Sequence, residues 1–171
     1  MRYAVKRKQK NSRMCFACGI DNQHGLHASF YELETNELVA LITLSPEHQS
    51  YPDRLHGGIA AAILDETIGR AIGIGRNDEL WGVTIELTTK FRKPIPLDKK
   101  LIVIGRITKE NNRSFEGAGE ILLENGDIAV SATGRYLKVP LDKITDVNMT
   151  ATDWLQIDDT DDPREIEIPG R

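Results

Sequence analysis

The spacing of apolar residues changes along the chain and predicts strands on both sides of one long helix. Two β-prone runs, residues 27–32 and 38–44, flank the polar segment 34–37, which predicts a hairpin. Residues 58–74 are rich in Ala, Ile and Leu and lack proline, which predicts a helix of about four turns. This is the one strong helical signal in the sequence.

The second half of the chain alternates apolar and polar positions, as strands do. In the run 81–91, apolar residues that begin with Val83 alternate with polar residues that include Thr84, which predicts one apolar and one polar face. Further strands are expected at residues 101–108, 114–123 and 128–139. Because the helix is apolar around most of its circumference, we expect an α+β fold in which an antiparallel sheet wraps around it.

The two ends of the chain carry opposite charge. Residues 1–13 contain six Lys or Arg and no acid, whereas residues 141–171 contain nine Asp or Glu against three Lys or Arg. We therefore expect a mobile basic arm over residues 1–14, one domain over residues 15–140 and an acidic tail thereafter. Trp154 is expected to dock part of this tail onto the domain.

Composition narrows the class of protein. The 171 residues are 40% hydrophobic, which is enough for the core of one domain. A net charge of −4 argues against a nucleic-acid partner. No apolar segment is long enough for a bilayer, and no apolar h-region follows the basic N-terminus, so we expect neither a membrane nor a secretory role. The expected location is the cytoplasm.

The two cysteines, Cys15 and Cys18, form a Cys-x-x-Cys pair. A zinc site needs two more ligands, and the nearby His24 and His27 are spaced more closely than zinc-binding histidines usually are. In a cytosolic protein a structural disulfide is not expected either. We therefore expect no metal and no cofactor, and interpret the pair as small, partly buried thiols in a turn closed by Gly19.

Candidate chemistry lies at the start and in the middle of the predicted helix. Gly57 and Gly58 can bring bare N–H groups close to a ligand at a helix N-terminus, where negative charge such as a developing oxyanion is favoured. Further along, Glu66 has Arg70 four residues later, which explains it as an ion pair. Asp65 has no such partner and is a poor helix former, so we favour it as the functional carboxylate.

These two parts are too far apart to act together within one chain. Asp65 lies about 13 Å further along the helix than the N–H groups that follow His56. A site that uses both parts must therefore be shared across a two-fold dimer. We expect a homodimer that assembles further, although the sequence leaves dimer and tetramer open. His56 is expected to orient the turn, and Thr84 to orient a water molecule or to act only as a strand former.

Four stretches of the sequence have features in common with one protein family. These stretches are His56-Gly57-Gly58, Leu64-Asp65-Glu66, residues 82–85 and residues 91–97. Together they resemble the hot-dog-fold acyl-CoA thioesterases of the PaaI-like, phenylacetate-degradation group. The resemblance covers residues 15–139. It implies that Asp65 is a general base or nucleophile, that the Gly57 N–H is an oxyanion donor beside Gly58, and that the site forms between two chains. In this family His56 would shape the loop and Thr84 would help to place water.

The resemblance also implies how an acyl-CoA substrate is held. Arg92, Lys93 and Arg113 stand where members of the family contact the phosphates of CoA. Many members have Asn six residues before the His, where this chain has Ser50. We expect Gln49 or Ser50 to supply that polar contact to the thioester.

The leading hypothesis is hydrolysis of an acyl-CoA to the free acid and CoA. One alternative is an acyl-CoA binding or sensing module without catalysis, since the hot-dog fold also serves as a ligand sensor. A hydratase on the same fold ranks lower, because the His56 and Asp65 of the motif are not placed for proton transfer on one carbon chain. The identity of the acyl group is left open by the sequence.

Overall fold

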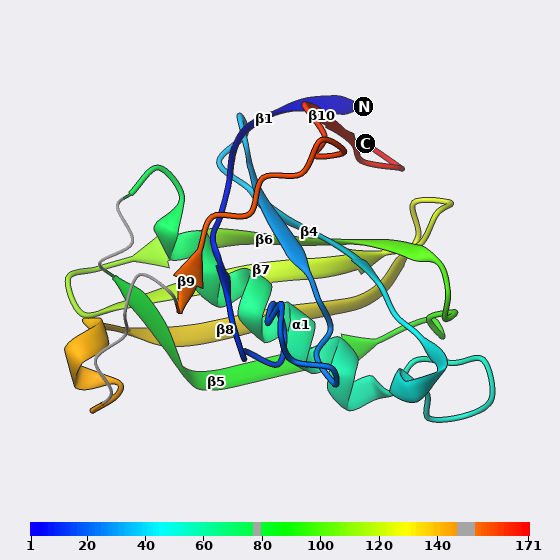
Figure 1. Ribbon diagram of the computed structural model, residues 1–171, viewed down its shortest axis with the longest axis horizontal. Helices are drawn as coiled ribbons and strands as arrows, with labels where there is room; N and C mark the ends of the chain where they lie inside the picture. Colours follow the sequence, from blue (N-terminus) through cyan, green and yellow to red (C-terminus); the bar gives the residue numbers. More distant parts are fainter. Residues whose placement is uncertain (77–79, 147–152) are drawn as a thin grey trace.

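The computed structural model describes residues 1–76, 80–146 and 153–171. The one α-helix among these residues, α1 (Gly57–Arg70), lies against one face of a large curved antiparallel sheet (Figure 1). A short 3-10 turn, η2 (Ala71–Gly73), follows it directly and accounts for most of the remaining length of the predicted helix. Part of the predicted acidic tail, residues 147–152, lies outside the described residues.

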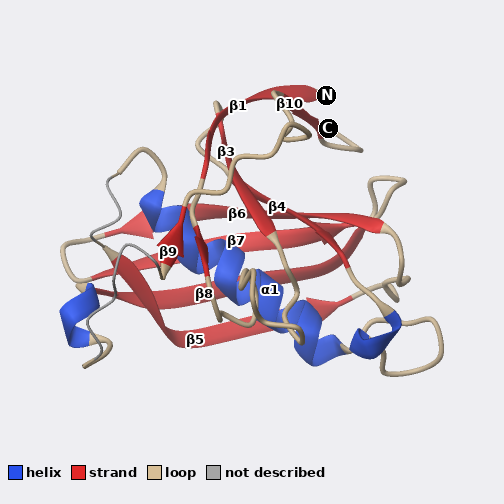
Figure 2. Ribbon diagram, in the orientation of Figure 1, coloured by secondary structure: helices blue, strands red, loops and turns tan. Residues whose placement is uncertain are grey.

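The main sheet has eight strands in the order β10-β1-β3-β4-β6-β7-β8-β5, and every neighbouring pair is antiparallel (Figure 2). Its strands are β1 (Arg2–Lys8), β3 (Ser29–Leu33), β4 (Leu38–Thr43), β5 (Trp81–Phe91), β6 (Lys100–Glu110), β7 (Ser114–Leu122), β8 (Ile128–Val139) and β10 (Glu165–Glu167). A second, two-stranded sheet joins β2 (Asn11–Ser12) to β9 (Trp154–Leu155). The short 3-10 helices η1 (Pro46–His48) and η3 (Leu141–Lys143) complete the elements. The predicted order of strands around one helix is therefore confirmed.

The core lies between α1 and the sheet. Ile63, Leu64 and Ile68 project from the helix and are fully buried. The sheet approaches the helix backbone closely at Gly105 of β6, where an added Cβ would lie 2.6 Å from the carbonyl oxygen of Thr67. This close approach fixes the helix, and with it the side chains that α1 presents.

The terminal segments contribute β1 and β10 to the sheet, which corrects the expectation of a mobile basic arm over residues 1–14. Alternate residues of β1 are partly buried, and Tyr3 and Val5 pack against a second apolar cluster on the outer side of the sheet. Basic residues at the end of this strand find acidic partners, since Lys8 Nζ lies 2.7 Å from Asp162 of the C-terminal segment. The predicted docking of Trp154 is confirmed, since Trp154 lies in β9 and packs edge-on against Trp81 with ring centroids 4.6 Å apart.

Strand β5 departs from the predicted alternation because it contains a β-bulge. Thr84 pairs with Tyr136 of β8, but the next paired residue is Glu86, so Ile85 is the extra residue. Val83 and Ile85 are consequently 37% and 49% exposed, and Thr84 is the residue that faces α1. The expectation of one apolar face running from Val83 along the whole strand is therefore wrong. β5 is also an edge strand, with no described strand on its outer side.

Candidate active site

Asp65 is held in place by two hydroxyl groups from the sheet. It projects from the middle of α1 and is half-buried. Thr84 of β5 donates a hydrogen bond from Oγ1 to Oδ1 at 2.9 Å, and the hydroxyl of Tyr136 of β8 donates to the same oxygen at 3.1 Å. Because Thr84 and Tyr136 are directly paired across the two strands, the sheet positions both donors as a unit. The carboxylate is therefore fixed but keeps an acceptor site free for a water molecule.

Burial dominates the electrostatics of this carboxylate. Desolvation raises the pKa of Asp65 above its usual range, and the hydrogen bonds from Thr84 and Tyr136 oppose that shift in part. The nearby charge of Glu66 adds to the rise. Burial and the negative charge of Asp65 also raise the pKa of Tyr136, which keeps its hydroxyl protonated as a donor. A carboxylate with a raised pKa is a stronger base than an exposed one.

Tyr136 belongs to this group, although the sequence alone does not single it out. It is fully buried, and its ring stacks on Phe115 with centroids 4.8 Å apart. Within the run 128–139 it looks like any other aromatic residue of a strand. Only the pairing of β8 with β5, together with the bulge at Ile85, brings Tyr136 opposite Thr84, and neither can be read from alternation alone.

The side chain of Asp65 faces a cavity of about 320 Å³. Its wall includes Asp65, Thr84, Tyr136, Cys15, Trp81 and Trp154. The two indole N–H groups are buried and have no hydrogen-bond partner in the described parts of the chain. Unpaired buried donors are costly in a native protein, so this wall is suited to a ligand that carries an acceptor.

The neighbour of Asp65 plays the structural role that the sequence predicts for it. Glu66 Oε1 accepts a hydrogen bond from Nε of Arg70 at 2.6 Å, which confirms the ion pair. Arg70 is more deeply buried than an exposed helix pair would be, because its guanidinium group lies between the rings of Phe30 and Trp154. It also donates from Nη2 to the sulfur of Cys18 at 3.0 Å. The pair therefore anchors α1 to the N-terminal loop.

The start of α1 forms the second part of the candidate site. His56 is the N-cap residue, and its Nδ1 accepts a hydrogen bond from Gly58 N–H at 2.9 Å. His56 therefore orients the turn, as expected. The N–H of Gly57 has no hydrogen-bond partner among the described residues. Because it stands in the first turn of the helix, it remains available to an anion.

A second cavity, of about 310 Å³, connects this helix start with basic residues. Its lining includes Gly57, Phe91, Arg92 and Lys93. The ring of Phe91 packs against Gly57, since a Cβ there would lie 3.3 Å from its Cε1 atom. The structure thus brings together the predicted oxyanion donor and two of the residues predicted to hold phosphates.

Gln49 and Ser50 lie close to the same helix start. Gln49 forms an isolated β-bridge with Leu55, and His56 N–H donates to the carbonyl of His48 at 2.9 Å. Both Gln49 and Ser50 are exposed. The chain therefore places these two predicted substrate contacts beside the loop that leads into Gly57.

Arg113 lies at the opposite end of the sheet. Its carbonyl accepts a hydrogen bond from Lys138, near the end of β8, whereas Arg92 donates from its N–H to Ala129, at the beginning of β8. At about 3.3 Å per residue, these two points on β8 are about 30 Å apart. Within one chain, Arg113 and the pair Arg92 and Lys93 therefore belong to different regions.

The predicted catalytic residues thus form two separate groups in one chain. Gly57 begins α1 and Asp65 follows eight residues later, which corresponds to about 12 Å along a helix that rises about 1.5 Å per residue. One group contains Asp65, Thr84 and Tyr136, and the other contains Gly57 with the basic residues of its cavity.

Comparison with known proteins shows which family and which folds the chain is similar to. Residues 53–130 match the family model of the thioesterase superfamily. A curated relative, the acyl-coenzyme A thioesterase THEM4 of Bos taurus, is 23% identical over 141 residues, which cover 81% of this chain and 57% of that protein. The chain thus spans little more than half the length of this relative.

Solved structures show the same fold. A thioesterase superfamily protein has a TM-score of 0.67 at 27% identity, covering 73% of this chain and 60% of its own. The E. coli PaaI protein from the phenylacetic acid degradation operon has a TM-score of 0.60 at 15% identity, covering 67% and 80%. The BH2602 protein of Bacillus halodurans, crystallised with CoA, has a TM-score of 0.54 at 22% identity, covering 59% and 66%. The predicted hot-dog fold and the resemblance to the thioesterase superfamily are confirmed.

Proposed function

Because the chain has the hot-dog fold and matches the thioesterase superfamily over residues 53–130, we propose that it hydrolyses an acyl-CoA to a free acid and CoA. The observation that carries the proposal is the state of Asp65. It is a half-buried carboxylate with a raised pKa, it is held by two hydroxyl donors, and it faces a cavity. These are the properties of a general base.

In the proposed reaction Asp65 takes a proton from a water molecule, and the water oxygen attacks the carbonyl carbon of the thioester. The carbonyl oxygen becomes an oxyanion, which accepts a hydrogen bond from the N–H of Gly57. When the tetrahedral intermediate collapses, the carbon–sulfur bond breaks and the CoA thiolate leaves. The proton held by Asp65 then passes to the thiolate or to solvent, which restores the carboxylate. Thr84 and Tyr136 hold the carboxylate in place and do not themselves exchange protons with the substrate.

The proposed site is shared by two chains that associate through β5. This edge strand has no described neighbour on its outer side and exposes Val83 and Ile85. Antiparallel pairing of two β5 strands about a two-fold axis sets the Thr84 end of one strand near the Phe91 end of the other. Since Phe91 contacts Gly57, this pairing brings Asp65 towards Gly57 of the partner subunit.

The same pairing explains the position of Arg113. Arg113 lies near the end of β8 that pairs with the first residues of β5, whereas Arg92 directly follows the last residue of β5. In the proposed dimer, Arg113 of one chain therefore approaches Arg92 and Lys93 of the partner subunit. Three cations gathered in this way suit the phosphates of CoA.

No helix in the described residues is long and apolar enough to cross a membrane.

A complementation experiment tests whether the site is shared. A heterodimer is prepared by tandem affinity purification from one chain with Asp65→Asn and one with Gly57→Pro. Proline fits the first position of a helix and removes the N–H group, and its added Cβ would lie 3.3 Å from Cε1 of Phe91, whose side chain must shift by a few tenths of an ångström. Circular dichroism checks that the second chain is folded. Each homodimer is expected to be inactive, whereas the heterodimer is expected to regain about half of the wild-type activity, because one of its two sites is complete. Activity is measured as CoA thiol released from a panel of acyl-CoAs.

The reciprocal heterodimer provides the matched control. It pairs a wild-type chain with a chain that carries both Asp65→Asn and Gly57→Pro. If the site is shared, neither of its two sites is complete and it is inactive. Activity in this heterodimer, with none in the first, would show that each chain contains its own site. Binding of acyl-CoA by the wild-type protein without release of CoA would overturn the hydrolase itself and favour a binding module.

The pH dependence of kcat/KM tests the role of Tyr136. The active form of Asp65 is the carboxylate, so activity is lost as the pH falls through its pKa. The hydroxyl of Tyr136 stabilises the carboxylate, so Tyr136→Phe is expected to raise the pKa of Asp65 and move the acidic limb of the profile to higher pH. The stacking on Phe115 is preserved in this variant.

Tyr3→Phe is the control, because Tyr3 lies in β1 away from the cavity and its variant is expected to keep the wild-type midpoint. If Tyr136→Phe lowers kcat but leaves the midpoint unchanged, Tyr136 acts only as a packing residue.

A further inference from the structure

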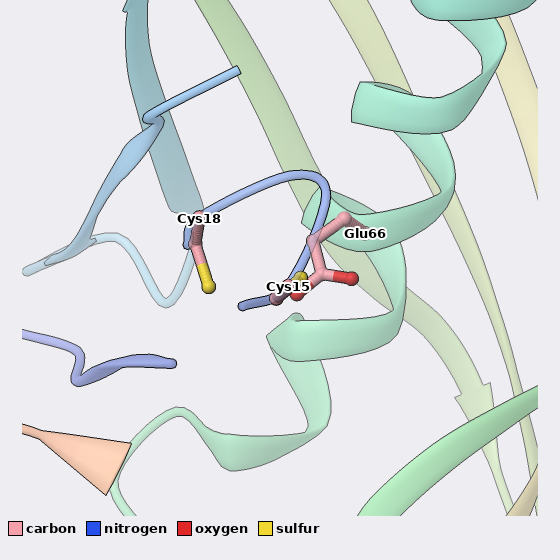
Figure 3. A group of neighbouring side chains, drawn as sticks. All are labelled: Cys15, Cys18 and Glu66. Atoms are coloured by element: carbon pink, nitrogen blue, oxygen red, sulfur yellow. The ribbon is translucent and has the colours of Figure 1, made fainter. Parts of the chain in front are cut away.

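Three potential metal ligands converge beside the cavity of Asp65. The sulfurs of Cys15 and Cys18 and a carboxylate oxygen of Glu66 all lie within 4.8 Å of one another. The two cysteines come from the loop between β2 and β3, and Glu66 comes from α1 (Figure 3). This group differs from the zinc set that the sequence offers, because His24 and His27 line a different cavity. The third ligand is remote in sequence and is brought in only by the fold.

The loop that carries the cysteines is built to hold both sulfurs on one side. The N–H of Gly19 donates to the carbonyl of Cys15 at 2.7 Å and closes the turn. A Cβ at Gly19 would lie 2.3 Å from that carbonyl oxygen, so no other residue fits without a shift of the backbone. The spacing Cys-x-x-Cys followed by this tight turn is a common form of one half of a zinc site.

Two N–H donors lie against the sulfur of Cys18. The sulfur of Cys18 accepts a hydrogen bond from Ser12 N–H at 3.3 Å and another from Nη2 of Arg70 at 3.0 Å. Thiolates are the form that binds metal, and hydrogen-bond donors around them are typical outer partners of a metal site. Neither cysteine is part of a disulfide in this structure.

The charge of the group would suit a divalent cation. With both cysteines as thiolates, the form in which they bind metal, the two sulfurs and the carboxylate of Glu66 would carry three negative charges beside the one positive charge of the buried Arg70 guanidinium. A bound zinc ion would balance the remaining two negative charges. Two sulfurs with one carboxylate oxygen are ligands that zinc accepts.

We propose that Cys15, Cys18 and Glu66 form a three-ligand zinc site, contrary to the sequence-based expectation of no metal. Cys15 and Glu66 line the cavity of Asp65, so the fourth position of the ion borders that cavity. The ion ties the N-terminal loop to α1 one residue beyond Asp65. The proposal is independent of the proposed hydrolysis, which uses none of these three side chains.

Cobalt is the probe for this site, because tetrahedral Co²⁺ bound by thiolates gives visible d–d bands and a sulfur-to-cobalt charge-transfer band. Reduced, metal-free protein is titrated with Co²⁺ and then with Zn²⁺. We expect one Co²⁺ per chain, with the spectrum of a tetrahedral thiolate site, and full displacement by one equivalent of Zn²⁺. The wild-type protein is also analysed for zinc as purified.

Variants identify the ligands. Cys15→Ser and Glu66→Gln are each expected to weaken Zn²⁺ binding more than about tenfold, measured by competition with a chromophoric chelator. His24→Ala is the matched control and is expected to bind as the wild type does. Circular dichroism confirms that each variant is folded. The proposal is overturned if the reduced wild-type protein shows no tetrahedral cobalt spectrum, or if folded Cys15→Ser and Glu66→Gln both bind Zn²⁺ with unchanged affinity.

Discussion

Replacing Asp65 by Asn is expected to lower kcat/KM for acyl-CoA hydrolysis by about 10³-fold, the range in which removal of a general base falls. Asn has the shape of Asp, so the contacts with Thr84 and Tyr136 on the sheet side are disturbed little. What is lost is the ability to take a proton from water. The expected effect is therefore on kcat rather than on KM, and it is measured by the release of CoA thiol under single-turnover and steady-state conditions.

Asp142→Asn is the control for this variant, because Asp142 lies in the exposed turn η3. It makes the same chemical change on the surface and is expected to leave kcat/KM at the wild-type value. A loss of less than about tenfold in a folded Asp65→Asn protein would remove Asp65 from the role of base, because a general base contributes at least 10²-fold.

Replacing Gly105 by Ala is expected to lower the free energy of unfolding by about 3 kcal/mol, near the upper end of the usual cost of overpacking. The added Cβ lies 2.6 Å from the carbonyl oxygen of Thr67 and 3.1 Å from the amide nitrogen of Ile68. Both atoms belong to the backbone of α1, so the whole helix must move away from the sheet. Urea denaturation at one fixed protein concentration measures the change.

Gly73→Ala is the matched control for the Gly105 variant. An added Cβ at Gly73 meets only the side-chain amide of Gln9, at an ordinary contact distance of 3.5 Å. The change is expected to stay within about 0.5 kcal/mol of the wild-type stability. Equal destabilisation by the two substitutions would show that the contact between β6 and α1 is looser than the structure indicates.

Local patterns were sufficient to predict the helix α1 and the six strands β3 to β8. The run 81–91 coincides with β5 and the run 128–139 with β8, because Pro94 and the Asn125-Gly126 turn mark where strands stop. The helix was also predictable, because residues 58–74 are rich in Ala, Ile and Leu and lack proline. Its apolar surface in turn predicts a sheet that covers it. These features depend on residues that are close together in the sequence, where propensity and turn chemistry act directly.

The remaining features depend on contacts between distant segments. β1 carries the charge pattern of a solvated arm, but Lys8 and Arg7 find acidic partners in Asp162 and Glu32. A run of basic residues can therefore form a strand when distant segments of the chain supply its acidic partners. The bulge at Ile85 shifts the alternation of β5 by one residue. The alternation of apolar residues that begins with Val83 therefore does not show that the side chain of Thr84 faces α1.

The candidate site also combines residues that the sequence predicts with residues that only the fold brings in. The helix start and Asp65 follow from the sequence, because glycines before a helix and an unpaired acid within it are local signals. Tyr136, and the burial of Arg70 between Phe30 and Trp154, follow from the fold alone. The spacing of Gly57 and Asp65 along one helix is the basis on which a shared site is predicted, and the edge of β5, which has no described neighbour, is where we propose that two chains meet.

The packing of Trp81 against Trp154 gives the protein a built-in optical reporter. The sequence contains two tryptophans, and both lie in the wall of the cavity that Asp65 faces. All of the indole fluorescence therefore arises beside this one carboxylate, and a molecule that enters the cavity changes the emission without any attached dye. The filling and emptying of the cavity can be followed in real time by stopped-flow on the unmodified chain.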